Sequence, residues 1–155
     1  MTIYFLRHAD AENMAASDFE RNLTPKGLEQ AAKVGRFCKA HGLAPEKILT
    51  SPLNRARQTA EIVAKALGAE PVVQDWLACG MRLETLLKEL SAQGKVESIL
   101  VVGHEPDFSS VISELIGASE GYGVLVTKAS LTAVDLPWME AGSGQLQFSI
   151  PVRLM

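Results

Sequence analysis

The chain has 155 residues, 47% of them hydrophobic, and a formal net charge of −3 at pH 7. This length and composition suit one core, so we expect a single domain over residues 1–155. An acidic balance argues against a sequence-independent nucleic-acid interface, which needs a basic face. No charged amino-terminal region precedes a long apolar stretch, and no apolar run approaches the roughly 18 residues of a membrane span. We therefore expect a cytoplasmic protein that binds neither nucleic acid nor membranes.

The two cysteines predict neither a disulfide framework nor a metal site. Cys38 and Cys79 are too few for the first and lack the spacing for the second. Because a free cysteine usually packs like a small hydrophobic residue, we expect both to be buried thiols.

The first predicted strand ends in two side chains that suit phosphate chemistry. Residues 2–6 are apolar and rich in β-branched and aromatic types, and Arg7 and His8 follow at once. The carboxyl ends of strands are where open α/β sheets present ligand-binding groups. An arginine fork matches phosphate oxygens, and a neutral histidine offers a nitrogen nucleophile or a general base.

Strands and helices alternate along the rest of the chain. After a loop over 11–22, amphipathic spacing with proline start and glycine stop signals predicts helices near 24–42, 51–68, 83–94 and 106–116. Strands are predicted at 47–50, 71–73, 98–103 and 130–136, and at 145–150 as an edge strand; 75–81 is a loop and 117–127 has no clear pattern. In the first helix Leu28 is expected to face inward, and His41 to cap the carboxyl end. The alternation predicts an α/β three-layer sandwich, with a mostly parallel central sheet and helices on both faces.

The arrangement at Arg7 and His8 recurs twice. The run 47–50 leads through Ser51-Pro52 to Arg55 in the next helix, and the run 98–103 is followed at once by His104. Parallel strands bring their carboxyl ends to one edge of a sheet, so these four side chains should converge on one anion. The amino end of the helix that carries Arg55 would favour the same anion.

Three segments resemble signatures of the histidine phosphatase superfamily, whose fold is phosphoglycerate mutase-like: Leu6-Arg7-His8-Ala9-Asp10, residues 51–59 and Val101-Val102-Gly103-His104. Chain length and the segment 21–27 make the chain most similar to the small SixA-type phosphohistidine phosphatases. The resemblance implies that His8 is the phospho-accepting nucleophile and that Arg7, Arg55 and His104 hold the phosphoryl group. It also covers Arg21, whose loop should fold over the pocket. Ala9 departs from the pattern, since the superfamily usually has glycine there.

Such a site needs positive charge around the phosphoryl oxygens and no metal or other cofactor. Attack by His8 would give a phosphohistidine that water then hydrolyses, while Arg7, Arg55 and a protonated His104 stabilise the charge. The proton donor stays open. Mutase relatives carry a glutamate after the second helix, and residues 77–80 hold none. Glu105 is one candidate, although an acid there equally suits the first turn of a helix.

Several functions remain in competition. The leading expectation is a metal-independent phosphohydrolase that acts on phosphohistidine borne by a protein, because short connections and a weak proton donor suit an open pocket and an imidazole leaving group. The alternatives are a broad-specificity small-molecule phosphatase of the same superfamily and a slow phosphoprotein-binding module. A metal site of His8, Asp10 and His104 is disfavoured, since two arginines would repel the cation. Asp10 and Glu12 are outside candidates for the proton donor.

Overall fold

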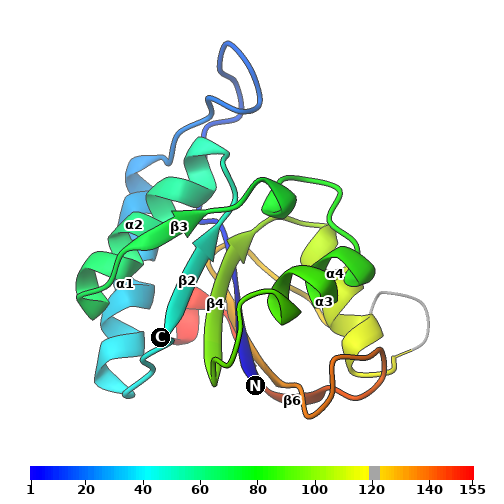
Figure 1. Cartoon of the computed structure of the whole chain (residues 1–155). Coiled ribbons are helices and arrows are strands. Elements are labelled where there is room, and N and C mark those ends of the chain that lie inside the picture. The colour runs from blue at the N-terminus through cyan, green and yellow to red at the C-terminus, as the bar shows by residue number, and fades with distance from the viewer. Residues whose placement is uncertain (119–122) are drawn as a thin grey trace.

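The apolar runs form one central sheet, and the structure, a computed structural model, describes residues 1–118 and 123–155 (Figure 1). Within these residues the strand order is β3-β2-β4-β1-β5-β6. The strands are β1 (Thr2–Arg7), β2 (Lys47–Thr50), β3 (Pro71–Val73), β4 (Ser98–Gly103), β5 (Leu131–Asp135) and β6 (Gln145–Ile150). β1 to β4 are parallel, whereas β5 and β6 run antiparallel beyond β1. The predicted mostly parallel sheet, with residues 145–150 at its edge, is confirmed.

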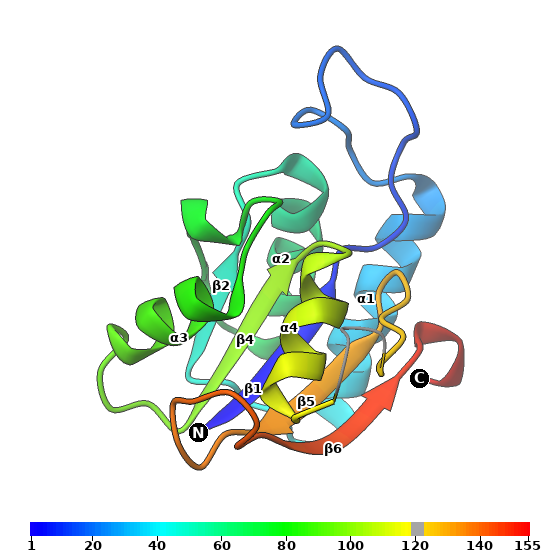
Figure 2. The same ribbon diagram turned by 90° about the vertical axis from the view of Figure 1, so that its right-hand side faces the viewer.

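Helices cover both faces of this sheet (Figures 1 and 2). α1 (Pro25–Ala40) and α2 (Asn54–Leu67) pack on one face, and α3 (Leu83–Ser91) and α4 (Asp107–Leu115) on the other. Successive strand residues point to opposite faces, so Ile3 and Phe5 enter the α3 and α4 core while Leu6 enters the α1 and α2 core. Two short 3₁₀ helices, η1 (Asp75–Leu77) and η2 (Val152–Leu154), complete the described elements. The three-layer expectation is therefore confirmed.

The start of α1 is pressed against the chain that leaves β1. The Thr24 hydroxyl accepts a hydrogen bond from the Gly27 amide at 3.1 Å, and Pro25 is the first helical residue, as predicted. A Cβ atom at Gly27 would lie 1.9 Å from the backbone oxygen of Asp10. This close approach is why glycine is needed there, and it fixes α1 relative to the residues that follow His8.

Some sequence expectations differ from the structure. The prediction that Leu28 faces the core is wrong. Its side chain is 47% exposed, and the neighbouring Gly27 is the buried residue of this turn. α2 begins at Asn54 rather than at Ser51-Pro52, and the Ser51 hydroxyl contacts the Leu53 amide at 3.3 Å and His104 Nε2 at 2.7 Å. His41 does cap α1, with its Nδ1 2.9 Å from the oxygen of Phe37. Residues 119–122, inside the stretch without a pattern, lie outside the described residues. No helix in 1–118 or 123–155 combines the length and the apolar character needed to cross a membrane.

Candidate active site

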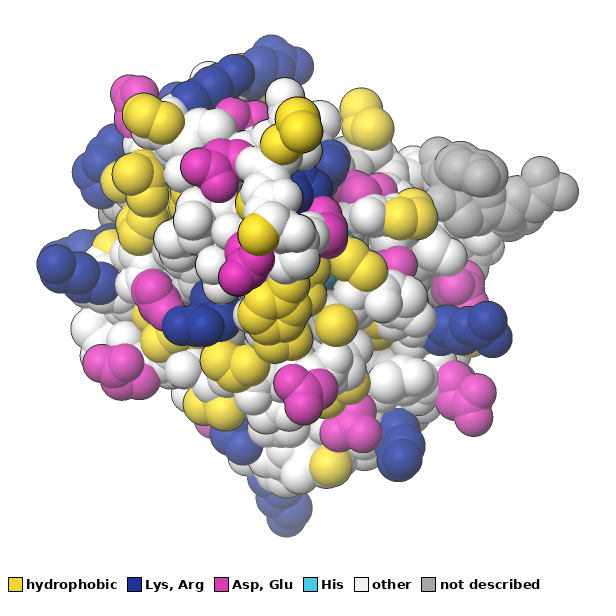
Figure 3. All heavy atoms as spheres, turned by 90° about the horizontal axis from the view of Figure 1, so that it is seen from above, with side chains coloured by type: hydrophobic (Ala, Val, Ile, Leu, Met, Phe, Trp, Pro, Cys, Tyr) yellow, Lys and Arg dark blue, Asp and Glu magenta, His cyan; other side chains and the backbone are white. Residues whose placement is uncertain are grey.

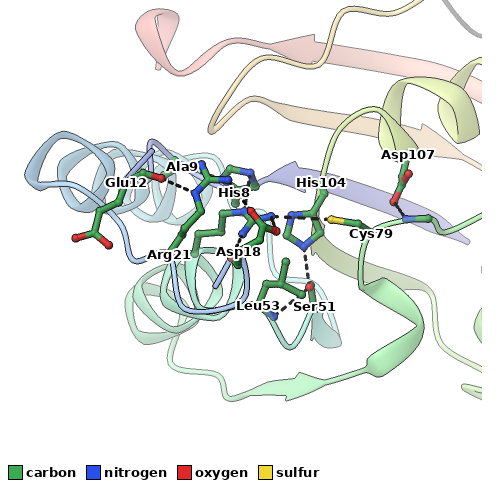
Figure 4. Close-up of polar contacts among 12 residues, drawn as sticks. His8, Ala9, Glu12, Asp18, Arg21, Ser51, Leu53, Cys79, His104 and Asp107 are labelled. Carbon is green, nitrogen blue, oxygen red and sulfur yellow. Dashed lines mark hydrogen bonds and ion pairs between the residues drawn. The ribbon is translucent and has the colours of Figure 1, made fainter. Parts of the chain in front are cut away.

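The carboxyl ends of the parallel strands bring four of the predicted residues to one place, and Figure 4 labels two of them, His8 and His104. Arg7 and His8 end β1, His104 follows β4, and Arg55 is the second residue of α2. The rings of His8 and His104 lie 5.3 Å apart between centroids, and Arg55 Nε lies 3.3 Å from His8 Nε2. The site is deep: in the view from above, histidine atoms show only as a small spot (Figure 3).

Backbone contacts fix which nitrogen of His8 is free. His8 Nδ1 lies 2.8 Å from the oxygen of Ala9, and a carbonyl oxygen can only accept, so Nδ1 carries the proton. Nε2 therefore keeps its lone pair and accepts from Arg55 Nε. The amide of His8 donates to the Gly103 oxygen at 3.0 Å, and the Ala9 amide donates to the Thr59 hydroxyl at 3.1 Å. These bonds hold the ring in one orientation.

The surroundings of His8 keep its ring neutral. Burial lowers the pKa of His8 to about 4; the hydrogen bond to Ala9 opposes that shift, and the charges of Arg55 and Arg7 add to it. A neutral imidazole with a free Nε2 is the form that can attack phosphorus.

His104 is held by a hydroxyl on the opposite wall. Its Nε2 lies 2.7 Å from Ser51 Oγ, which already accepts from the Leu53 amide at 3.3 Å. The Ser51 hydroxyl can therefore donate to Nε2, which leaves the proton of a neutral His104 on Nδ1, a buried atom without a hydrogen-bond partner in residues 1–118 and 123–155.

The surroundings of His104 also lower its pKa. Burial, and next the neighbouring His8, lower the pKa of His104 to about 3. These surroundings favour the neutral ring, whereas the expectation of a protonated His104 concerned a ring beside a bound phosphoryl group and stays a prediction. A phosphoryl dianion beside the ring would push this pKa back upward. Even a neutral ring offers an N–H donor.

Arg55 is paired with a residue that the sequence analysis did not name. Its Nη1 donates to the backbone oxygen of Asp18 at 2.8 Å and its Nη2 to the Asp18 carboxylate at 3.1 Å. The same carboxylate accepts from Arg21 Nη1 at 2.8 Å, and the hydrogen bond from Arg21, followed by that from Arg55, lowers the pKa of Asp18. Arg21 thus reaches the site through Asp18, which stands three residues earlier in the loop already expected to cover the pocket.

Arg7 and Glu105 lie on the α4 side of the site. Arg7 Nη1 donates to the Val126 oxygen at 2.9 Å, while Arg7 Nε is buried and has no hydrogen-bond partner among the residues that the structure describes. Both oxygens of Glu105 are occupied at the start of α4, by the Ser109 amide at 3.2 Å and the Ser109 hydroxyl at 2.6 Å. Its charge still acts on the pKa of Arg7, which burial lowers and Glu105 raises. The helix-end interpretation of Glu105 therefore gains support.

The remaining acidic candidates are also engaged. Asp10 accepts from Lys128 Nζ and from the Thr24 hydroxyl, both at 2.7 Å, and Glu12 accepts from the Asn22 amide at 3.0 Å. In the part of the chain that the structure describes, no three His, Cys, Asp or Glu residues gather as metal ligands would.

The prediction that Cys79 is a buried thiol is wrong. Its side chain is exposed, with Sγ 4.0 Å from Arg55 Nη2, whereas Cys38 is buried as expected. The loop that carries Cys79 is tied to α4, since the Asp107 carboxylate accepts from the Gly80 amide at 2.8 Å. A thiol, rather than a carboxylate, therefore borders the site on this side.

Known proteins share both the sequence and the fold. Residues 3–78 match the histidine phosphatase superfamily (branch 1). Phosphohistidine phosphatase SixA of Escherichia coli is 29% identical over 97% of this chain and 93% of its own, and the SixA homolog of Haemophilus influenzae is 33% identical over 76% and 78%. A solved structure of the protein histidine phosphatase SixA complexed with tungstate matches with a TM-score of 0.88 at 28% identity, over 99% of both chains. The chain therefore belongs to the histidine phosphatase superfamily and has SixA-type phosphohistidine phosphatases among its relatives.

Proposed function

We propose that the protein is a metal-independent phosphatase that uses His8 as its nucleophile and acts on phosphohistidine carried by a protein. The observation that carries the proposal is the state of His8. Its Nδ1 proton is held by the oxygen of Ala9, its pKa is lowered to about 4, and its unprotonated Nε2 accepts a hydrogen bond from Arg55 Nε. These are the requirements for a nitrogen nucleophile at neutral pH.

The reaction has two displacements at phosphorus. In the first, the lone pair of His8 Nε2 forms a bond to phosphorus, and the bond to the leaving group breaks with its electron pair. In the second, water attacks phosphorus, the P–Nε2 bond breaks, and phosphate leaves while the water gives up a proton. Arg55, Arg7 and the N–H of His104 surround the place where the transferred oxygens would lie, and their charge and donors favour the transition state.

The choice of leaving group rests on the engaged carboxylates. Asp10, Asp18 and Glu105 are all held by other groups, and Asp18 is shared by two arginines that favour its ionised form. An alkoxide leaving group needs strong protonation in the transition state, whereas an imidazole leaves more readily. A site with weak proton donors therefore suits phosphohistidine, which is also the substrate named for the two SixA relatives. The two alternatives are a broad-specificity small-molecule phosphatase and a slow phosphoprotein-binding module.

The test compares kcat/KM for a phosphohistidine-bearing protein domain, a phosphoserine peptide and p-nitrophenyl phosphate, each with excess chelator. We expect turnover of the first to be the most efficient and to survive chelation. Equal efficiency on phosphoserine would favour the small-molecule or broad phosphatase, and binding without turnover would favour the binding module. In Glu105→Gln, loss of the phosphate esters alone would identify Glu105 as their proton donor.

The nucleophile is tested by trapping. Radiolabelled phosphate should appear on the wild-type protein as an acid-labile, base-stable adduct and should be absent from His8→Ala. His41→Ala removes an exposed histidine and is the matched control, because its label should equal that of the wild type. Label that persists in His8→Ala, or that is acid-stable, would contradict the assignment.

A further inference from the structure

A cavity of about 470 Å³ lies beside the candidate active site. Four parts of the chain form its wall: the residue that follows the His8-Ala9 pair, the first turns of α1, the segment 125–130 before β5, and the residues after β6. In Figure 2 the C-terminal end lies next to α1 and to the segment that enters β5. The residues used below are Asp10, Lys26, Leu125, Lys128 and Arg153, all in this wall.

The cavity is positively charged although the protein is acidic overall. Lys26, Lys128 and Arg153 line it, and Asp10 is the one carboxylate among the lining residues in the described part of the chain. That carboxylate is already satisfied by Lys128 Nζ and the Thr24 hydroxyl, both at 2.7 Å. The side chains of Lys26 and Arg153 are exposed and make no ion pair among the described residues. Two cations are thus left available to an anion from solution.

The beginning of α1 adds to this charge. α1 has 16 residues and no acidic residue in its first turn, and the Asp10 carboxylate, 2.7 Å from the Thr24 hydroxyl, offsets the positive end of its dipole only in part. Lys26 is the second residue of that turn. The amino end of α1 and the charge of Lys26 therefore both attract an anion into the cavity.

The cavity is coupled to the phosphoryl site through short connections. Asp10 is two residues from His8, and Lys128 is close enough for its charge to help lower the pKa of His8. The Val126 oxygen that holds Arg7 belongs to the segment that lines the cavity. A group bound in the cavity would therefore sit next to a phosphoryl group bound at His8.

We propose that this cavity binds an acidic side chain of the protein substrate, a neighbour of the phosphohistidine; this rests on the proposed function. The cations supply the attraction, and Leu125, whose side chain is 82% exposed, supplies an apolar contact at the rim. The loop over residues 11–22 also exposes large apolar side chains, Met14 at 87% and Phe19 at 47%. Exposed apolar residues that flank charged ones suit a protein surface better than a small anion.

The test removes the two available cations and leaves the phosphoryl site intact. Lys26→Gln/Arg153→Gln should raise KM for a phosphohistidine-bearing protein domain by roughly tenfold, as expected for two exposed charges, with kcat unchanged and a weaker dependence on salt. With p-nitrophenyl phosphate, which reaches only the phosphoryl site, kcat and KM should equal those of the wild type.

The matched control is Lys39→Gln/Lys65→Gln, which also removes two positive charges. These lysines line another cavity, of about 390 Å³, between the carboxyl ends of α1 and α2. The control should keep wild-type kinetics on the protein substrate. An equal loss in the control would overturn the proposal in favour of general charge attraction, and so would an unchanged KM in Lys26→Gln/Arg153→Gln or a loss on p-nitrophenyl phosphate.

Failure of the proposed function would look different. In that case the wild-type protein itself would not dephosphorylate the phosphohistidine domain, and no comparison of variants would be needed. A final experiment changes the substrate instead. When the acidic residues near the phosphohistidine of the substrate domain are replaced by glutamine, the wild-type protein and Lys26→Gln/Arg153→Gln should have the same KM for it. A remaining difference in KM would also overturn the proposal.

Discussion

Lowering the pH from 7 to 5 should destabilise the fold through its two buried histidines. Burial brings the pKa of His8 to about 4 and that of His104 to about 3, whereas a histidine in an unfolded chain titrates at about 6.5. Between these values the unfolded chain binds protons that the folded protein does not. The free energy of unfolding therefore falls as the pH drops through the unfolded pKa, and the loss stops growing only near the folded pKa.

The size of the effect follows from the two pKa values. At pH 5 an unfolded histidine is almost fully protonated, while folded His8 remains about nine-tenths neutral. Proton linkage then lowers the free energy of unfolding by about 2 kcal/mol between pH 7 and pH 5 because of His8, and by a similar amount because of His104. At pH 5 neither folded ring takes up much proton, so the two losses add.

The assay is urea unfolding at pH 7 and pH 5. From pH 7 to pH 5 the free energy of unfolding of His8→Gln should fall by about 2 kcal/mol less than that of the wild type, because the variant lacks the His8 contribution. The contributions of the carboxylates are common to both proteins and cancel in this comparison. His41→Gln replaces an exposed histidine and controls for the removal of an imidazole. An equal fall in wild type and His8→Gln would refute the reasoning that burial keeps His8 neutral.

Three further variants test the site and its support. Arg55→Ala should lower kcat/KM by roughly 10² or more, whereas Arg57→Ala, on the exposed side of the same helix, should stay near wild type in steady-state assays. Asp18→Asn should tighten inhibition by inorganic phosphate about fivefold, because Arg55 is then no longer shared with a carboxylate; weaker inhibition would mean that Asp18 orients Arg55 instead. Gly27→Ala should lower the urea-derived stability by about 1–3 kcal/mol, because its Cβ would collide with the Asp10 oxygen, and an unchanged midpoint would show that α1 can shift without cost.

The sequence predicted the parts of the site that strand ends determine. Arg7, His8 and His104 are fixed to β1 and β4 by covalent adjacency, so recognising the strands was enough to place them. Arg55 followed from its nearness to β2 and the start of α2. Hydrophobic patterns reach this far because a buried parallel strand has a clear apolar run and a defined carboxyl end.

What the sequence could not predict depends on contacts across space. Asp18 lies in a loop without periodicity, and nothing local says that its carboxylate will bridge Arg55 and Arg21. Leu28 is exposed because α1 turns Gly27 toward the backbone of Asp10. The spacing of apolar residues in the sequence does not reveal this contact. The neutral state of His104 depends on burial and on His8, which becomes its neighbour only after folding.

The position of β1 between two late strands also decides when the site can exist. β1 pairs with β4, which begins at Ser98, on one edge and with β5, which begins at Leu131, on the other. A chain emerging from the ribosome already contains His8 and Arg55 long before either partner of β1 has been made. Contacts so distant in sequence form slowly, since a long loop must close before they contribute. During synthesis the proposed nucleophile, His8, therefore remains an ordinary, solvated histidine, and its buried, neutral state appears only when the central sheet closes around it.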